Sequence, residues 1–147
     1  MILMNASFRD NHTNRNKLKK WERVALENFK IKMTDKTKLF PCIPATIGFS
    51  LNQLRYGFIG DPRETETVKQ LAYLLKNFTE ESKEIGDYTS LIIFFQLPED
   101  SRNSYTVENY EQLFWKLLST LSTIDDAEWP QEIPADPHDP IWEYCFQ

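Results

Sequence analysis

The sequence predicts an α/β fold, with α+β as the alternative, in which three helices and about three strands follow one another as α-β-α-β-α-β. Three observations support this prediction. Apolar residues recur every three or four positions in three separate segments, as they do on the buried side of a helix. Apolar, β-branched and aromatic runs typical of strands lie between and after these segments. The chain has 147 residues, which is the length of a single domain.

The first predicted helix covers residues 16–34. Its helical spacing is formed by Leu18, Trp21, Ala25 and Phe29. Residues 1–15 are rich in asparagine and show no periodicity, so we expect a flexible arm there. Residues 16–147 are predicted to form one domain.

An uncharged segment follows this helix. No charged residue lies between Lys38 and Arg55, although 27% of the chain is charged. Pro41 and Pro44 disfavour a regular helix at the start of this segment. Its last part, residues 54–60, alternates enough in character to predict a short strand.

The stretch "DPRE" at residues 61–64 has the signature of a helix start. Asp61 can act as the N-cap, Pro62 fits the first helical position, and Glu64 fits a capping box. The amphipathic helix that follows is expected to extend to about Ser82. A role of these charged residues at a binding site therefore competes with a capping role.

The second half of the chain predicts a strand, a helix and a final strand. The run "YTSLIIFFQL" at residues 88–97 is apolar on both faces, as in a strand that is covered on two sides. The stretch "PEDSRNS" ends it, and Thr106 then caps a helix that extends to Leu121. After Ile124 the chain is rich in proline and acidic residues, which predicts an irregular loop. The last stretch, "IWEYCFQ" at residues 141–147, predicts the third strand.

The sequence stops within this last predicted strand, without a turn or a polar tail behind it. Natural termini usually fray into solvent, so we expect a truncated product whose final strand lacks neighbours. The alternative is a short native C-terminus on an edge strand. An open edge with aromatic residues from Trp142 to Phe146 would favour self-association.

Composition and charge argue against several classes of function. The net charge of −5 disfavours binding to nucleic acid, which requires a basic surface. No apolar run approaches the roughly 18 residues that span a bilayer, and the N-terminus turns polar too early for a secretory signal. We therefore expect a cytoplasmic protein without a membrane partner, in which Cys42 and Cys145 are thiols. The common short catalytic and metal-binding signatures are absent from the sequence.

Four segments resemble the YqcI/YcgG family of bacterial proteins in their order and spacing: "FPCIPATIGFSLNQLRYGFIGDPRE", "DYTSLIIFF", "EQLFWKLL" and "WPQEIPADPHDPIWEYCF". The resemblance extends from about Trp21 to Phe146. Family members are longer, so the resemblance implies a fold that is incomplete relative to the family. Most members are uncharacterised, and some relatives are haem-dependent N-hydroxylases of arginine or related guanidines. The resemblance thus implies an ancestry among haem-dependent oxygenases, with haem as the candidate cofactor and a small guanidine as the candidate substrate; the alternative is that this chain has lost haem binding.

Haem needs an axial ligand, usually His, Cys, Met or Tyr. Cys42 in the uncharged segment and His138 in "DPHDP" are the candidate metal ligands, and Cys42 is the better placed of the two. His12 lies in the polar arm and is a poor candidate. The resemblance also implies a His-containing family segment beyond Gln147, which is a stronger source of a ligand.

Residues 40–64 and the "DPHDP" loop are the expected walls of a pocket. The glycines of this span let the backbone approach a flat apolar ligand, and a guanidine would pair with a carboxylate such as Asp61 or Glu64. The alternative is a buried connection that packs against the first helix. The candidate ligand-binding residues are Cys42, Arg55, Tyr56, Asp61, Arg63, Glu64 and His138.

Two hypotheses of function follow from these observations. The first is an enzyme related to the haem-dependent N-oxygenases, with an arginine-like guanidine as its substrate. The second is a non-catalytic or degenerate module for binding or interaction, or an inactive fragment.

Overall fold

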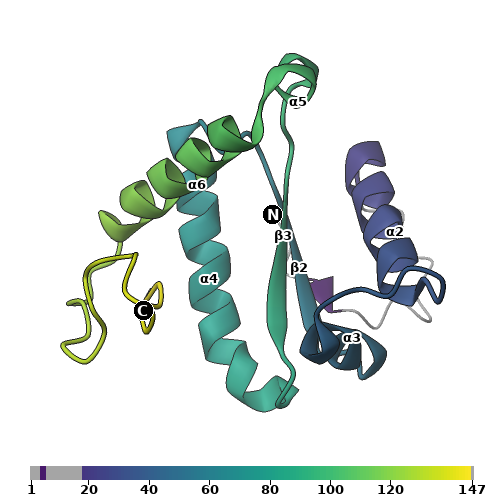
Figure 1. Ribbon diagram of the computed structural model, residues 1–147, viewed down its shortest axis with the longest axis horizontal. Coiled ribbons are helices and arrows are strands. Elements are labelled where there is room, and N and C mark those ends of the chain that lie inside the picture. The colour runs from purple at the N-terminus through teal and green to yellow at the C-terminus, as the bar shows by residue number, and fades with distance from the viewer. Residues whose placement is uncertain (1–3, 6–17, 147) are drawn as a thin grey trace.

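The computed structural model describes residues 4–5 and 18–146, and Figure 1 shows their arrangement. The elements in this part of the chain are the strands β1 (Met4–Asn5), β2 (Leu54–Ile59) and β3 (Ser90–Phe95) and the helices α2 (Lys20–Thr34), α3 (Ile43–Ser50), α4 (Thr65–Ile85), α5 (Glu99–Ser104) and α6 (Val107–Ser122). The prediction of a mixed α/β fold is confirmed. The predicted order of elements is wrong in four places, because β1 precedes the first helix, α3 and α5 are additional helices, and the last predicted strand does not form within the described residues.

The sheet has the order β1-β2-β3. Strands β2 and β3 are parallel and pair from Leu54 with Ser90 to Ile59 with Phe95. The two residues of β1 pair antiparallel to β2, with Met4 opposite Tyr56. The arm predicted over residues 1–15 otherwise lies outside the described residues. Because β2 has a neighbour on each side, all six of its residues are buried, whereas those of β3 are half-buried.

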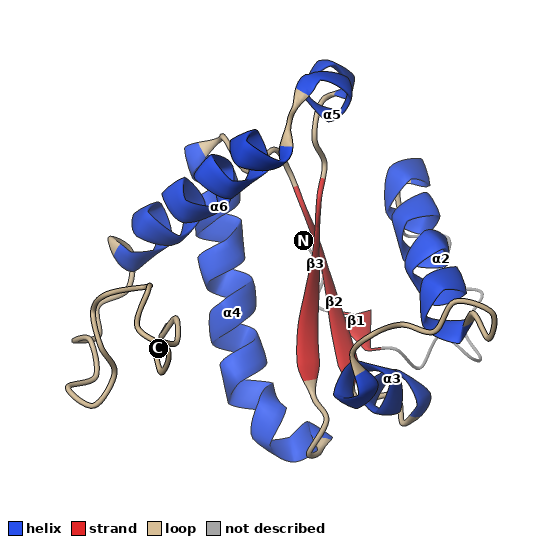
Figure 2. Ribbon diagram, in the orientation of Figure 1, coloured by secondary structure: helices blue, strands red, loops and turns tan. Residues whose placement is uncertain are grey.

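Helices cover both faces of the sheet, as Figure 2 shows: α2 and α3 lie on one side, and α4 and α6 lie on the other. The side chains of β2 alternate between these faces, which is the period of a strand. The first core cluster packs between the sheet and α2, and its buried members are Leu18, Leu26, Met33, Leu54, Tyr56 and Phe58.

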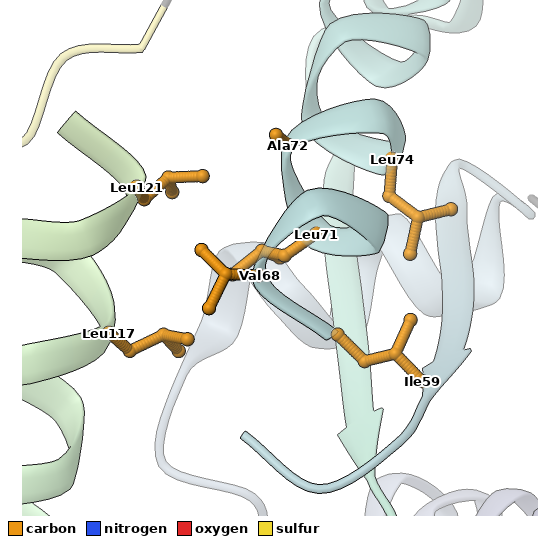
Figure 3. Close-up of a cluster of buried hydrophobic side chains, with 7 residues drawn as sticks. All are labelled: Ile59, Val68, Leu71, Ala72, Leu74, Leu117 and Leu121. Atoms are coloured by element: carbon orange, nitrogen blue, oxygen red, sulfur yellow. The ribbon is translucent and has the colours of Figure 1, made fainter. Parts of the chain in front are cut away.

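The second core cluster packs between the sheet, α4 and α6 (Figure 3). Its buried members are Ile59, Val68, Leu71, Ala72, Leu74, Leu117 and Leu121. Leu117 and Leu121 of α6 point toward α4, and Leu74 of α4 points toward the sheet. Gly57 of β2 makes room for this packing, because a Cβ atom there would lie 2.6 Å from Leu74 Cδ1.

Helix α3 corrects the prediction that prolines exclude a helix at the start of the uncharged segment. Pro44 lies in the first turn of α3, where a backbone N–H has no partner within the helix and proline is tolerated. The helix also lies very close to the chain before β3. A Cβ atom on Gly48 would lie 2.2 Å from the carbonyl oxygen of Tyr88, so this contact requires glycine.

The start of α4 corrects a second prediction. The N-cap is Glu64, and its side chain makes no capping hydrogen bond. Asp61 does not cap the helix because its carboxylate accepts hydrogen bonds from the backbone N–H of Arg63 at 3.0 Å and from Arg63 Nε at 2.9 Å. Residues 61–64 therefore form a turn, in which the backbone N–H of Glu64 donates a hydrogen bond to the carbonyl oxygen of Asp61 at 3.0 Å.

The cap of α6 is as predicted. The backbone N–H of Asn109 donates to Thr106 Oγ1 at 3.3 Å, and the backbone N–H of Thr106 donates to Asn109 Oδ1 at 3.0 Å. This reciprocal pair satisfies two donors at the helix end. The stretch "PEDSRNS" was expected only to end a strand, but it contains the whole of the short helix α5, with Pro98 as its N-cap, between β3 and α6.

The third strand predicted over residues 141–147 does not form within the described residues. Asp139 takes two of the amides that a strand would need: its carboxylate accepts from the N–H of Ile141 at 3.0 Å, and its carbonyl accepts from the N–H of Trp142 at 3.0 Å. Tyr144 instead packs on α6, and its hydroxyl donates to the Leu118 carbonyl at 3.1 Å. Residues 125–146 form the irregular segment beside α6 in Figure 1, so the predicted loop is longer than expected.

Among the described helices, none combines the length and the apolar character that a bilayer-spanning segment requires.

Candidate functional site

A cavity of about 300 Å³ opens at the carboxyl ends of the two parallel strands. Phe58, Ile59 and Gly60 line it at the end of β2, and Gln96 lines it directly after β3. In α/β sheets this edge is the usual place for ligands, because the strands end there and the following helices begin there. The cavity is therefore the candidate site of this chain.

The walls of the cavity come from the beginnings of two helices on opposite faces of the sheet. The start of α4 contributes Glu64, Glu66, Thr67 and Gln70. The start of α2 and the residues just before it contribute Leu18, Lys19, Trp21 and Glu22. Gly60 permits a close approach between the end of β2 and α4, since a Cβ atom there would lie 2.9 Å from Thr67 Oγ1.

The charged lining of the cavity is predominantly acidic, with three carboxylates and one lysine ammonium group. Glu22 accepts a hydrogen bond from the Lys19 backbone N–H at 2.8 Å. The Glu66 carboxylate lies 3.6 Å from Lys69 Nζ. Glu64 is exposed, and its carboxylate has no ion pair or hydrogen bond within the described part of the chain. Glu64 is thus the one carboxylate of the lining that has no interaction within the described part of the chain.

The cavity also contains an aromatic wall. Trp21 of α2 meets the ring of Phe58 edge-on, with 6.0 Å between the ring centroids. The indole Nε1 of Trp21 is buried and has no hydrogen-bond partner among the described residues. A buried N–H without a partner is energetically unfavourable.

Of the residues that the sequence nominated, Glu64 alone is in this lining. Asp61 and Arg63 lie in the turn before it and pair with each other. Their hydrogen bond lowers the pKa of the Asp61 carboxyl from its usual value and raises the pKa of the Arg63 guanidinium. This pair holds the turn that precedes Glu64, so its contribution to the site is positional.

Arg55 and Tyr56 are adjacent on β2 but point to opposite faces of the sheet. Arg55 is buried beside α4, where its Nε lies 3.6 Å from Glu81 Oε2. Tyr56 is buried in the first core cluster, and burial raises the pKa of its hydroxyl to about 12. Both side chains are in the interior of the fold, and neither is among the cavity-lining residues.

Cys42 and His138 lie in other parts of the structure. Cys42 is exposed at the start of α3. His138 is exposed in a turn of the C-terminal segment, where its backbone N–H donates to Asp136 Oδ1 at 2.9 Å. Neither the DPHDP loop nor most of residues 40–64 contributes to this cavity. Binding roles for these two residues stay predictions.

Sequence reasoning missed the contributions of Trp21, Gln70 and Gln96. A signal for them was present, because the carboxyl ends of the two predicted strands should be neighbours in a parallel sheet. Gln96 follows one of these ends directly. Trp21 was assigned to the core on its helical spacing, and it does pack on the first core cluster.

The described residues do not fit a haem site at this cavity. Its lining contains no His, Cys, Met or Tyr, which are the usual axial ligands. Cys42 and His138 lie outside the lining, and the described residues contain no group of three or more His, Cys, Asp or Glu suited to a metal ion. We therefore assign no step to haem in this chain.

Comparisons with known proteins agree with the resemblance seen in the sequence. The chain is 45% identical over 129 residues to YcgG of Bacillus subtilis (strain 168), a match that covers 88% of this chain and 51% of YcgG. It is 45% identical over 126 residues to YqcI of the same organism, which covers 86% of this chain and 50% of YqcI.

A more distant match is DcsA of Streptomyces lavendulae, whose name proposes an N(omega)-hydroxy-L-arginine synthase. It is 26% identical over 130 residues, covering 86% of this chain and 47% of DcsA. The chain thus spans about half the length of the curated relatives that it matches. No solved structure matches significantly. The model of the YqcI/YcgG family matches residues 29–147, which is most of the chain, and the chain therefore belongs to the YqcI/YcgG family.

Proposed function

We propose that this chain recognises a guanidine-bearing small molecule, as part of a longer protein that N-hydroxylates such a substrate, the reaction that the name of DcsA proposes. The observation that carries this proposal is the carboxylate of Glu64, which is exposed at the cavity and lacks a partner among the described residues. The acidic excess of the lining favours a cationic ligand over an anionic one.

A guanidinium group suits this carboxylate in geometry as well as in charge. Its parallel N–H groups can donate to both carboxylate oxygens at once, and such charge-assisted bonds are about twice as strong as neutral ones. Gln70 and Gln96 offer amide donors and acceptors for the remaining polar atoms of an amino acid. A volume of about 300 Å³ lies at the lower end of the range for small-molecule sites.

The proposal assigns substrate recognition, and not the oxygenation step, to the described residues. They provide a carboxylate, two amides and an aromatic wall, and the cavity lacks an axial haem ligand. In a protein of family length, the redox chemistry would depend on the half that this chain does not span. The proposal is therefore tested by binding.

The experiment is a calorimetric titration of the chain with L-arginine and with L-citrulline, which has nearly the same shape but carries a neutral urea. We expect arginine to bind more tightly than citrulline. Substituting Glu64→Gln should remove most of this difference and weaken arginine binding by about tenfold to a hundredfold, the cost of losing one charge-assisted hydrogen-bonding group.

The matched control is Glu84→Gln, which removes one carboxylate at the opposite end of the same helix, where the side chain is exposed. It should leave arginine binding unchanged. Equal affinity for arginine and citrulline, or equal weakening by the two substitutions, would contradict recognition of the guanidinium by Glu64.

A further inference from the structure

The strand β3 occupies the edge of the sheet in the described part of the chain, yet its composition is that of a central strand. Its residues, "SLIIFF", include no charge and no proline. Edge strands of soluble proteins usually carry such residues because they prevent pairing with other chains. Runs of apolar, β-branched and aromatic residues are typical of parallel strands that are covered on both faces.

Both faces of β3 are in fact covered. Leu91, Ile93 and Phe95 pack on the second core cluster, beside α4. Ile92 and Phe94 pack on the first core cluster, and Phe94 stacks on Phe58 of β2 with 5.2 Å between the ring centroids. All six residues nevertheless keep intermediate exposure, whereas all six of β2 are buried. The exposure of β3 therefore lies along its outer edge.

The direction of the backbone groups at this edge follows from one hydrogen bond. The N–H of Gln96 donates to the Ile59 carbonyl at 3.0 Å, so the backbone N–H and C=O groups of residue 96 point toward β2. Successive residues of a strand direct their N–H and C=O groups to opposite sides, so positions 92 and 94 also face β2. We call Ile92, Phe94 and Gln96 the inner amides. The outer amides, which face away from β2, are those of Leu91, Ile93 and Phe95.

Within the described part of the chain, no strand pairs with the outer amides. The curated relatives YcgG and YqcI are about twice as long as the part of them that this chain matches. We propose that the outer edge of β3 binds a strand from the half of the family-length protein that this chain does not span. That strand should be apolar on both faces, since helices flank the sheet on both sides (Figure 2).

The proposal is independent of any ligand in the cavity, and hydrogen exchange tests it residue by residue. In the chain alone, NMR-detected exchange should be slow at the inner amides and at least tenfold faster at the outer amides. Adding the separately expressed part of YcgG that lies outside the 129-residue match should slow the outer amides at least tenfold. The inner amides should change much less.

Three results would overturn the proposal. The outer amides could be protected already in the dilute chain, or they could become protected only as its concentration rises, which would indicate pairing with a second copy. They could also stay unprotected when the YcgG portion is added. As a second measurement, the aligned amides of full-length YcgG should all exchange slowly, and fast exchange at the outer positions there would contradict the proposal as well.

A pair of substitutions isolates the backbone contribution. Ile93→Ala and Ile93→Pro both remove the side chain from the second core cluster, but only proline also removes an outer N–H. Ile93→Ala should still bind the YcgG portion, and Ile93→Pro should bind it at least tenfold more weakly. Equal binding by the two variants would contradict strand pairing at this edge.

Discussion

The substitution Tyr56→Phe tests whether the hydroxyl of Tyr56 has any role in the folded chain. The residue is 1% exposed, and its ring meets Phe29 edge-on at 5.9 Å. The hydroxyl oxygen is buried without a hydrogen-bond partner among the described residues. Burying such a group without a partner costs about 1–3 kcal/mol. Removing the oxygen relieves this cost but also loses the dispersion contacts of the oxygen atom, which offsets part of the gain.

We therefore expect Tyr56→Phe to raise the free energy of unfolding by about 1 kcal/mol. In a chain of this size that corresponds to an increase in Tm of about 2–4 °C. Two other tyrosines provide controls. Tyr73 is 54% exposed, so Tyr73→Phe should change stability by less than about 0.5 kcal/mol. Tyr144 donates to the Leu118 carbonyl, so Tyr144→Phe should destabilise by about 1 kcal/mol.

The pH dependence of stability gives a second measurement on Tyr56. Burial raises the pKa of its hydroxyl to about 12, compared with an ordinary value of 10.0. Between these values the unfolded chain loses the proton and the folded chain keeps it, so stability falls as pH rises. The slope from this group is about 1.4 kcal/mol per pH unit at most. Urea unfolding between pH 9 and pH 11.5 should show this loss in the wild type and a smaller loss in Tyr56→Phe.

Destabilisation of Tyr56→Phe to the same degree as Tyr144→Phe would refute this reasoning. It would mean that the hydroxyl donates or accepts a hydrogen bond in solution, and Tyr56 would again be a candidate ligand-binding residue.

Two further predictions concern packing. Gly48→Ala should lower the free energy of unfolding by about 1–2 kcal/mol, because the new methyl group collides with the Tyr88 carbonyl. This overpacking outweighs the gain of about 1 kcal/mol in helix propensity. Thermal unfolding measures the change, and an unchanged Tm would mean that α3 does not lie against this carbonyl. Leu121→Ala should cost about 2–5 kcal/mol in urea unfolding, since Leu121 is fully buried between α6 and α4, while Leu39→Ala at a position 78% exposed should have little effect.

The sequence predicted the elements whose hydrogen bonds are local and whose apolar pattern is long. Thr106 and Asn109 form their capping pair within one turn, so the start of α6 could be read from the residues alone. Strand β3 could be predicted for the second of these reasons. The apolar run around Ile92 and Ile93 is long enough that few other structures are compatible with it.

The predictions failed where a neighbouring residue competed for a group. Asp61 has the right position for an N-cap, but Arg63 supplies donors for its carboxylate, and α4 begins later. The aromatic end of the chain looks like a strand by composition, yet Asp139 binds the amides that would form the ladder. Such competition is decided by side-chain geometry, which spacing does not record.

The candidate site was only partly accessible to sequence reasoning for a related reason. Glu64, which lines the cavity, was nominated because the resemblance implied a guanidine and a carboxylate complements it. Trp21 and Gln96 lie far from Glu64 along the chain. The parallel pairing of β2 and β3 brings Gln96 to the cavity, and the packing of α2 on the first core cluster brings Trp21 there.

The position of the cavity has a mechanical consequence. Its two walls belong to layers that are otherwise connected through the sheet, since α2 rests on one face and α4 on the other. A ligand in the cavity would contact both layers. Because it would bind only the folded chain, its binding would raise the free energy of unfolding. A saturating ligand should therefore slow the opening of the first turn of α2, because Trp21 and Glu22 of that turn line the cavity.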